Sequence, residues 1–287
     1  MKLTIKYLRL YGKSLLKLIR WVNLLLVFFT QYVVYVLIVR NGDDLAALWP
    51  PIEFFFLTIS TLLIAAAGYV INDYYDIKID LVNKPGRVVI GKIITRRQSL
   101  FIHAIFNGVA ILLGLLLSWR VALFFTTCGF LLWLYSNYLK RTALWGNVCV
   151  SLLTAATIWV VTLYYKENSR LVVLYSVFAF FISLVREVVK DMEDVKGDVA
   201  YGCRTLPIIW GFRKTKLFLI AIMMIFIGLL LYQAGINARS LPYYVLVFPI
   251  IYLIVRLLIA DKRRDYMFLS SYCKWFMVVG VISLIVV

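Results

Sequence analysis

Nine long apolar segments constrain the fold of this 287-residue chain more than any other feature. Each approaches or reaches the roughly 17–25 residues that cross about 30 Å of hydrocarbon as a helix. Lipid cannot satisfy unpaired backbone groups, and the ~10-residue alternating segments of a membrane barrel are absent. The sequence therefore predicts an all-α, polytopic membrane protein with a single integral membrane domain over residues 1–287. The nine segments are Trp21–Val39, Phe54–Val70, Phe101–Ser118, Val121–Tyr138, Val148–Tyr165, Leu171–Val188, Leu217–Tyr232, Tyr244–Ile259 and Ser270–Val287.

The distribution of basic residues predicts how the chain is oriented. The N-terminal tail and every second loop together hold 24 Lys and Arg residues, and the opposite side holds five. By the positive-inside rule, the N-terminus and the basic loops at 71–99 and 186–216 face the cytoplasm, and the C-terminus lies outside. The expected location is the cell inner membrane. Because orientation explains most of the net charge of +17, no nucleic-acid partner is expected; the oligomeric state stays open.

The first 20 residues carry a separate pattern. Their basic residues recur every three or four positions, which places them within about an 80° arc of a helix. Leu and Ile fill much of the remaining surface, so residues 1–20 are predicted to form an amphipathic helix at the lipid interface. The alternative is that these charges only anchor the N-terminus on the cytoplasmic side. The basic residues are Lys2, Lys6, Arg9, Lys13, Lys17 and Arg20.

Acidic residues are scarce, and their placement points to a site. Of 14 carboxylates, eight fall in two short segments, each of which follows an apolar segment. Three aspartates in each segment have the same spacing, 118 residues apart in the chain. This repetition suggests a pseudo-repeat with motifs at 72–87 and 191–204. The two patterns are Asp73-x-x-Asp76-x-x-x-Asp80 and Asp191-x-x-Asp194-x-x-x-Asp198.

Helix geometry gives this spacing a chemical meaning. If the helices continue through the motifs, the acidic residues of each motif share one face, within an arc of about 60–100°. Like charges on one face repel, and bound divalent cations would relieve that repulsion. Carboxylate oxygens with few other ligands suit Mg²⁺, which binds substrate phosphates as well. The alternative is a solvated acidic face that pairs with lysines. Positive charge for a phosphate-rich ligand would come from Lys84, Arg87, Lys140, Lys190 and Arg204.

These motifs resemble those of a known family. Asn72-Asp73-x-x-Asp76-x-x-x-Asp80 is similar to the first aspartate-rich motif of the UbiA-type intramembrane prenyltransferases, and the pattern from Asp191 to Asp198 is similar to the second. Arg20-x-x-Asn23 resembles a motif of the first helix, although Trp21 replaces a proline. Residues 190–198 are most similar to the archaeal branch, which includes geranylgeranylglycerol-phosphate geranylgeranyltransferases.

The resemblance implies a fold and a reaction. The nine transmembrane helices would surround a central cavity, and two Mg²⁺ ions would bridge the aspartates and the diphosphate of an isoprenyl donor. The acceptor would be a lipid such as geranylgeranylglycerol phosphate; the alternative is an aromatic ring in quinone biosynthesis. A cation-coupled transporter is a distant alternative, because its ionisable groups would sit near the middle of the membrane on broken helices.

The resemblance also assigns roles to residues. The expected catalytic carboxylates are Asp76, Asp80, Asp194 and Asp198. The expected metal ligands are Asn72, Asp73, Asp76, Asp80, Asp191, Asp194 and Asp198. The expected substrate-binding residues are Arg20, Asn23, Lys84, Arg87, Tyr138, Lys140 and Arg204.

Overall fold

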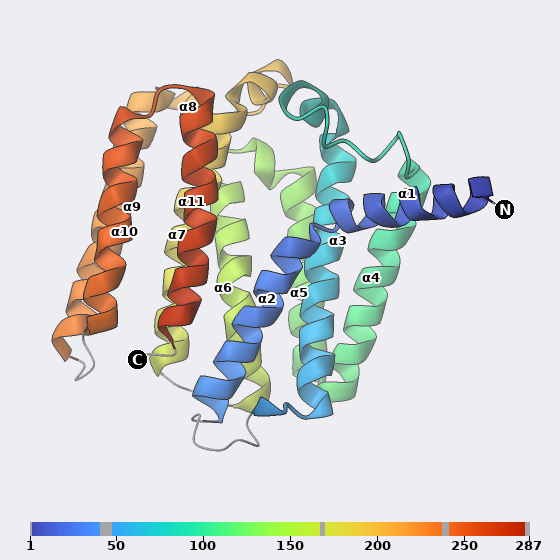
Figure 1. Cartoon of the computed structure of the whole chain (residues 1–287), viewed down its shortest axis with the longest axis horizontal. Helices are drawn as coiled ribbons and strands as arrows, with labels where there is room; N and C mark the ends of the chain where they lie inside the picture. The colour runs from blue at the N-terminus through green and yellow to red at the C-terminus, as the bar shows by residue number, and fades with distance from the viewer. Residues whose placement is uncertain (1, 41–47, 167–169, 237–240, 285–287) are drawn as a thin grey trace.

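The computed structural model describes residues 2–40, 48–166, 170–236 and 241–284, and these ranges are built mainly of helices (Figure 1). Within them, nine helical segments are long and apolar enough to cross a membrane, as the sequence predicts. The first crossing segment combines α2 with the π-helix η1. The elements are α1 (Lys2–Leu18), α2 (Trp21–Val34), η1 (Tyr35–Val39), α3 (Ile52–Asn83), α4 (Arg96–Leu117), α5 (Trp119–Asn137), η3 (Leu139–Arg141), α6 (Trp145–Tyr165), α7 (Arg170–Ala200), α8 (Leu206–Ile209), α9 (Gly211–Ile236), α10 (Leu241–Ile259) and α11 (Arg263–Ser283).

Two helices are longer than the apolar segments that predict them. The helices α3 and α7 have 32 and 31 residues, so each is roughly 46–48 Å long and exceeds the hydrocarbon thickness of about 30 Å. The apolar segments end at Val70 and Val188, but backbone hydrogen bonding continues through the polar motifs. The helix α3 ends at Asn83, two residues before Pro85, because proline cannot continue a helix.

The last helix is also displaced from its predicted position. α11 begins at Arg263, seven residues before the predicted start at Ser270. Its first turn is polar, and the Asp265 carboxylate accepts the backbone N–H of Lys262 at 2.9 Å, which stabilises the helix start. The predicted end at Val287 lies outside the described residues.

The helix α1 lies across the bundle rather than along it (Figure 1). The chain changes direction at Arg20, which adopts the left-handed conformation with φ of 53°. Such a backbone is strained for a residue with a side chain, at a cost of about 1–3 kcal/mol. Leu18 is buried against Val70 and Ile94, and the Lys17 ammonium donates to the Gly86 carbonyl at 2.7 Å. These contacts hold α1 against the end of the bundle that carries the first motif.

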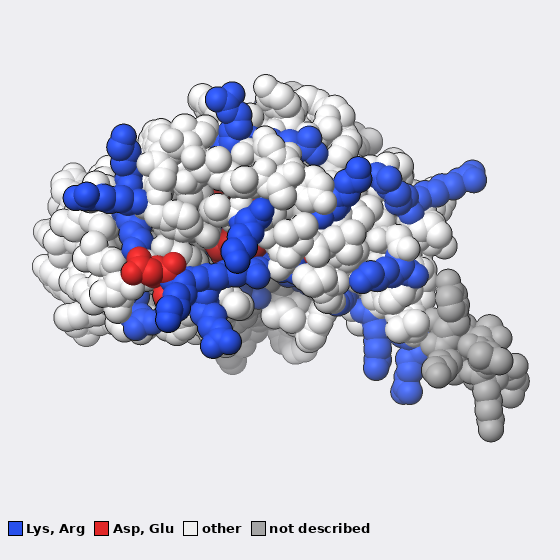
Figure 2. Space-filling model, turned by 90° about the horizontal axis from the view of Figure 1, so that it is seen from above, with Lys and Arg blue, Asp and Glu red and all other residues white. Residues whose placement is uncertain are grey.

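The helix α7 is the centre of the bundle and packs against α3, α6, α9 and α11. The helices α9 and α10 pack on each other at one edge of the molecule (Figure 1). Figure 2 shows Lys and Arg side chains spread over the end of the bundle at which α3 and α7 terminate. This distribution agrees with the count of Lys and Arg residues in the N-terminal tail and alternate loops. The orientation across a membrane stays a prediction.

Candidate active site

A central cavity opens between the helices at the end that carries the aspartate motifs. Its empty volume is about 1830 Å³, including its open mouth, and its lining comes from α2, α3, α5, α6, α7 and α11. Eleven of the predicted site residues line it. They are Arg20, Asn23, Asn72, Asp76, Asp80, Lys84, Arg87, Lys140, Asp191, Asp194 and Asp198.

The first motif presents its residues on one face of α3. Asn72, Asp76 and Asp80 are four residues apart, so they project from successive turns. Asp76 is only 3% exposed and pairs with the Lys140 ammonium, which comes from η3. Burial opposes the charged ammonium, but the Asp76 carboxylate outweighs burial and holds the pKa of Lys140 above its ordinary value. Lys140 therefore stays positively charged at neutral pH.

Asp73 lies beside this face and contacts Arg20, which follows α1. Its carboxylate accepts a hydrogen bond from Arg20 Nη2 at 2.9 Å, and the Arg20 guanidinium also lies 4.7 Å from the centre of the Tyr69 ring. These two contacts hold the strained Arg20 backbone at the turn between α1 and α2. Asp73 is not among the residues that line the cavity. Its contacts indicate that Asp73 positions the Arg20 side chain.

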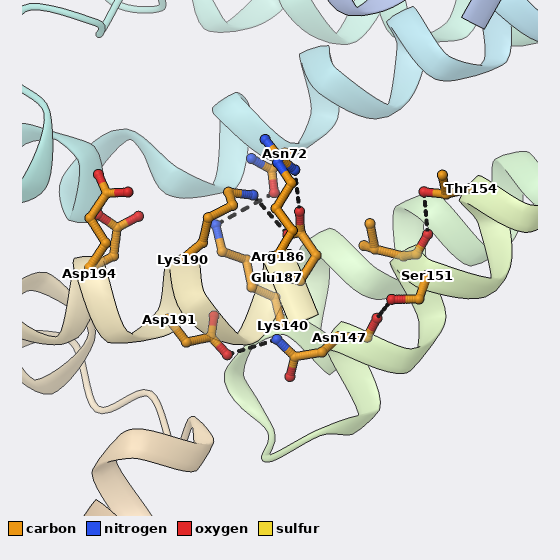
Figure 3. Close-up of polar contacts among 12 residues, drawn as sticks. Asn72, Lys140, Asn147, Ser151, Thr154, Arg186, Glu187, Lys190, Asp191 and Asp194 are labelled. Atoms are coloured by element: carbon orange, nitrogen blue, oxygen red, sulfur yellow. Dashed lines mark hydrogen bonds and ion pairs between the residues drawn. The ribbon is translucent and has the colours of Figure 1, made fainter. Parts of the chain in front are cut away.

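The second motif faces the same cavity from α7. Asp191 accepts a hydrogen bond at 2.8 Å from Asn147 Nδ2 of α6, which Figure 3 shows. Asp194 Oδ2 accepts from the Lys84 ammonium at 2.7 Å. Lys84 also lies 3.2 Å from Glu193 and therefore connects the end of the first motif to the second.

A close joint between α3 and α7 fixes the two motifs relative to each other. The Asn83 side chain accepts the Gly197 N–H at 2.9 Å and donates to the Asp194 carbonyl at 3.0 Å. A Cβ atom at Gly197 would lie 2.3 Å from Asn83 Nδ2, so only glycine permits this approach. Arg263 Nη2 donates to the Asn83 carbonyl at 2.6 Å and ties α11 to the same joint.

We expect Gly197→Ala to destabilise the protein by about 1–3 kcal/mol, because the new methyl group displaces the buried Asn83 side chain. The thermal midpoint in detergent should fall, and activity should fall with it. The matched control is Gly108→Ala, because Gly108 is helical and a Cβ there meets nothing within 4 Å. Equal midpoints for the two variants would contradict the importance of the joint.

The carboxylates of the cavity fit a metal ion that arrives together with a phosphate ligand. Within the described ranges, the side-chain carboxylates of Asp80 and Asp198 make no ion pair or hydrogen bond, and the buried Asp194 Oδ1 lacks a hydrogen-bond partner. No three acidic, His or Cys side chains among the described residues lie close enough to bind a metal by themselves. Mg²⁺ suits this arrangement, because it keeps water ligands and uses one or two carboxylates plus substrate phosphates.

Two predicted substrate-binding residues do not reach the cavity. Tyr138 is 63% exposed, because α5 ends at Asn137 and the turn carries Tyr138 off the inward face. Arg204 is exposed after the turn at Gly202, and its backbone N–H donates to the Arg141 carbonyl at 2.9 Å. The sequence motif indicates the position of such residues in the chain but not the direction of their side chains.

Several charged residues outside the predicted substrate-binding set also line the cavity. Arg186 Nη1 and Lys190 Nζ both bind the Glu187 carboxylate, at 2.6 and 2.7 Å (Figure 3). The Lys274 ammonium of α11 donates to Asn23 Oδ1 of α2 at 2.6 Å. The available signal in the sequence was the presence of Arg186 and Lys274 within apolar helices, since charges there are costly and usually functional.

A second, mostly apolar cavity adjoins the first. Its empty volume is about 710 Å³, and the two cavities share lining residues of α2, α6 and α11. On α7 its lining extends to Tyr175, 16 residues and about 24 Å from Asp191. Three aromatic rings pack there: the Phe178 ring centroid lies 5.5 Å from that of Tyr175 and 5.1 Å from that of Phe226. We call this second cavity the apolar chamber.

Residues 21–278 match the model of the UbiA prenyltransferase family. A digeranylgeranylglyceryl phosphate synthase from Methanosphaera stadtmanae is 33% identical over 204 residues, which cover 71% of this chain and 71% of that protein. One from Sulfurisphaera tokodaii is 35% identical over 239 residues, covering 79% and 85%.

Solved structures share the architecture. A structure described for digeranylgeranylglyceryl phosphate synthase in membranes has a TM-score of 0.71 at 25% identity and covers 96% of this chain and 98% of that one. A UbiA homologue from Archaeoglobus fulgidus bound to GPP and Mg²⁺ has a TM-score of 0.63 at 14% identity, covering 95% and 100%. At 14% identity the likeness concerns the fold alone.

Proposed function

This chain belongs to the UbiA prenyltransferase family, and from that membership we propose that it transfers a geranylgeranyl group from geranylgeranyl diphosphate to geranylgeranylglyceryl phosphate. The observation that carries the proposal is the pairing of two aspartate motifs across one cavity that continues into the apolar chamber. Relatives named digeranylgeranylglyceryl phosphate synthase, at 33–35% identity, support the choice of acceptor. The product would be an ether-linked lipid.

The diphosphate of the donor binds between the two motifs in this proposal. Two Mg²⁺ ions would be held there and would supply positive charge that stabilises the departing diphosphate. Lys84 and Lys140 already lie beside Asp194 and Asp76, and Arg87 lines the same cavity, so these three cations can bind diphosphate oxygens. The metal ligands are Asn72, Asp76, Asp80, Asp191, Asp194 and Asp198.

The reaction exchanges one carbon–oxygen bond for another. The bond between the first carbon of the donor and its diphosphate breaks, and the electron pair leaves with the diphosphate. The acceptor hydroxyl oxygen attacks the resulting allylic cation, an ether bond forms, and the hydroxyl proton is released. The isoprenyl chain lies in the apolar chamber, whose lining excludes the water that would otherwise capture the cation.

The position in the membrane is part of the same proposal. The basic end of the bundle faces the cytoplasm, the C-terminus faces outward, and the membrane is the cell inner membrane. The cross-lying helix α1 rests at the lipid interface with its exposed basic residues Arg9 and Lys13 toward anionic headgroups. The donor and the acceptor then reach the cavity from the cytoplasmic half of the bilayer.

A competition between acceptors tests the proposed reaction. Purified protein receives geranylgeranyl diphosphate, Mg²⁺, geranylgeranylglyceryl phosphate and an aromatic acceptor such as 4-hydroxybenzoate, and mass spectrometry identifies the products. We expect a prenyl ether of the lipid phosphate, and a chelator should suppress it. A prenylated aromatic ring without the ether would instead support the quinone-pathway alternative.

A further inference from the structure

Charges in the central cavity are divided between two groups. Near the ends of α3 and α7, five carboxylates line the cavity with two lysines and Arg87, so negative charge is in excess. The lysines are Lys84 and Lys140. Deeper on α7 and on α11, the cavity is lined by three cations, Arg186, Lys190 and Lys274, and by one carboxylate, Glu187, which pairs with Arg186 and Lys190. The deeper group therefore has two positive charges in excess.

Lys274 has an incomplete set of partners for a cation within a membrane helix. Its ammonium donates to the Asn23 amide oxygen at 2.6 Å, and the described residues give it no carboxylate partner. Asn23 in turn donates to the Tyr69 hydroxyl at 3.3 Å, which fixes the orientation of the amide. An amide oxygen compensates only part of the cost of burying an ammonium.

Arg186, on the neighbouring helix α7, has a hydrogen-bond donor that is not used. Its Nη1 atom binds Glu187 at 2.6 Å, but its buried Nε has no hydrogen-bond partner in the described part of the chain. The helices α7 and α11 pack together and both cations line the central cavity, so the like charges of Lys274 and Arg186 repel each other. An anion between the two cations would relieve this repulsion and use the remaining donors.

The depth of this basic pair suits a lipid headgroup. Asn23 is the third residue of α2, immediately after the cross-lying α1, so Lys274 sits near the level of the predicted lipid interface. Arg186 is five residues from Asp191, about 7.5 Å along α7. That separation is comparable to the few bonds between a glycerol hydroxyl and a phosphate on the same glycerol.

We infer that Lys274 and Arg186 bind the phosphate monoester of the acceptor lipid, at a subsite separate from the aspartate-lined diphosphate site. The inference rests on the proposed function. A phosphate monoester carries a charge of about −1.5 to −2, which matches the excess of two positive charges. Held there, the acceptor presents its hydroxyl toward the first carbon of the donor, whose diphosphate lies at the aspartates.

The test compares an acceptor with and without its phosphate. Initial rates are measured with geranylgeranylglyceryl phosphate and with geranylgeranylglycerol, for the wild-type protein and Lys274→Gln. We divide kcat/KM for geranylgeranylglyceryl phosphate by kcat/KM for geranylgeranylglycerol. This ratio should fall by about tenfold to 100-fold in the variant, since a charged hydrogen bond to the phosphate is lost. The KM for the donor should stay within about twofold.

Two further variants keep the test decisive. Lys274→Arg retains the charge and should restore most of the ratio, and Lys274→Met replaces Lys274→Gln if that variant does not fold in detergent. The matched control is Lys78→Gln, because Lys78 is exposed on α3 and does not line the cavity. It should leave the ratio unchanged.

The outcomes separate the inference from the function on which it rests. If both acceptors lose the same factor, or if the KM for the donor rises instead, Lys274 does not bind the acceptor phosphate and the inference is wrong. If the wild-type protein transfers nothing to either glycerol lipid but prenylates an aromatic acceptor, the proposed function itself fails.

Discussion

Asp76→Asn and Asp194→Asn are each expected to reduce Mg²⁺-dependent transfer of a labelled isoprenyl group by about 10³-fold or more. Each carboxylate is the middle acid of its motif and faces the central cavity, and electrostatic stabilisation of the departing diphosphate depends on them in the proposed mechanism. Asparagine keeps the size of the side chain and one oxygen acceptor. The measurement is incorporation of label into lipid, together with the thermal midpoint in detergent.

Glu193→Gln is the matched control for Asp194→Asn. Glu193 is the neighbouring residue, it is buried, and it also pairs with Lys84, but it does not line the cavity. Loss of an ion pair to Lys84 is therefore common to both variants, and only Asp194→Asn removes a cavity carboxylate. We expect Glu193→Gln to keep most of the activity. Full activity in both aspartate variants, or transfer that a chelator does not affect, would contradict the mechanism.

The helices and the faces they present could be predicted from the sequence. Apolar length identifies the crossing segments, and the spacing of four residues places Asn72, Asp76 and Asp80 on one side of α3. These properties are local, because they depend on hydrophobicity and on helix geometry alone. The extra length of α3 and α7 is less visible, since apolar segments end where charged residues begin.

The partners of the charged residues could not be predicted in the same way. Lys84 and Asp194 are 110 positions apart, and Lys274 and Asn23 are 251 positions apart. Such pairs depend on how the helices pack, which no local pattern contains. The sequence thus predicts two acidic clusters, whereas the fold adds the lysines that neutralise part of each cluster and the basic pair deeper in the cavity.

Gly280→Leu is expected to shorten the isoprenyl donor that the protein accepts. Gly280 of α11 lines the apolar chamber, and a Cβ there meets nothing within 4 Å, so a larger side chain enters the chamber without displacing its neighbours. An extended chain advances about 1.1–1.2 Å per bond, so four isoprene units extend roughly 18–20 Å. A geranylgeranyl tail that starts near Asp191 therefore reaches the depth that the added leucine fills.

The measurement is kcat/KM for geranyl and for geranylgeranyl diphosphate with the same acceptor. The ratio should shift toward the shorter donor by about tenfold or more, because the long chain must be bent or expelled from the filled space. Gly228→Leu is the control: a Cβ at Gly228 of α9 also meets nothing within 4 Å, and the residue lines neither cavity. An equal loss with both donors would indicate damage to the bundle. An unchanged ratio in a folded, active Gly280→Leu variant would place the donor chain outside the apolar chamber.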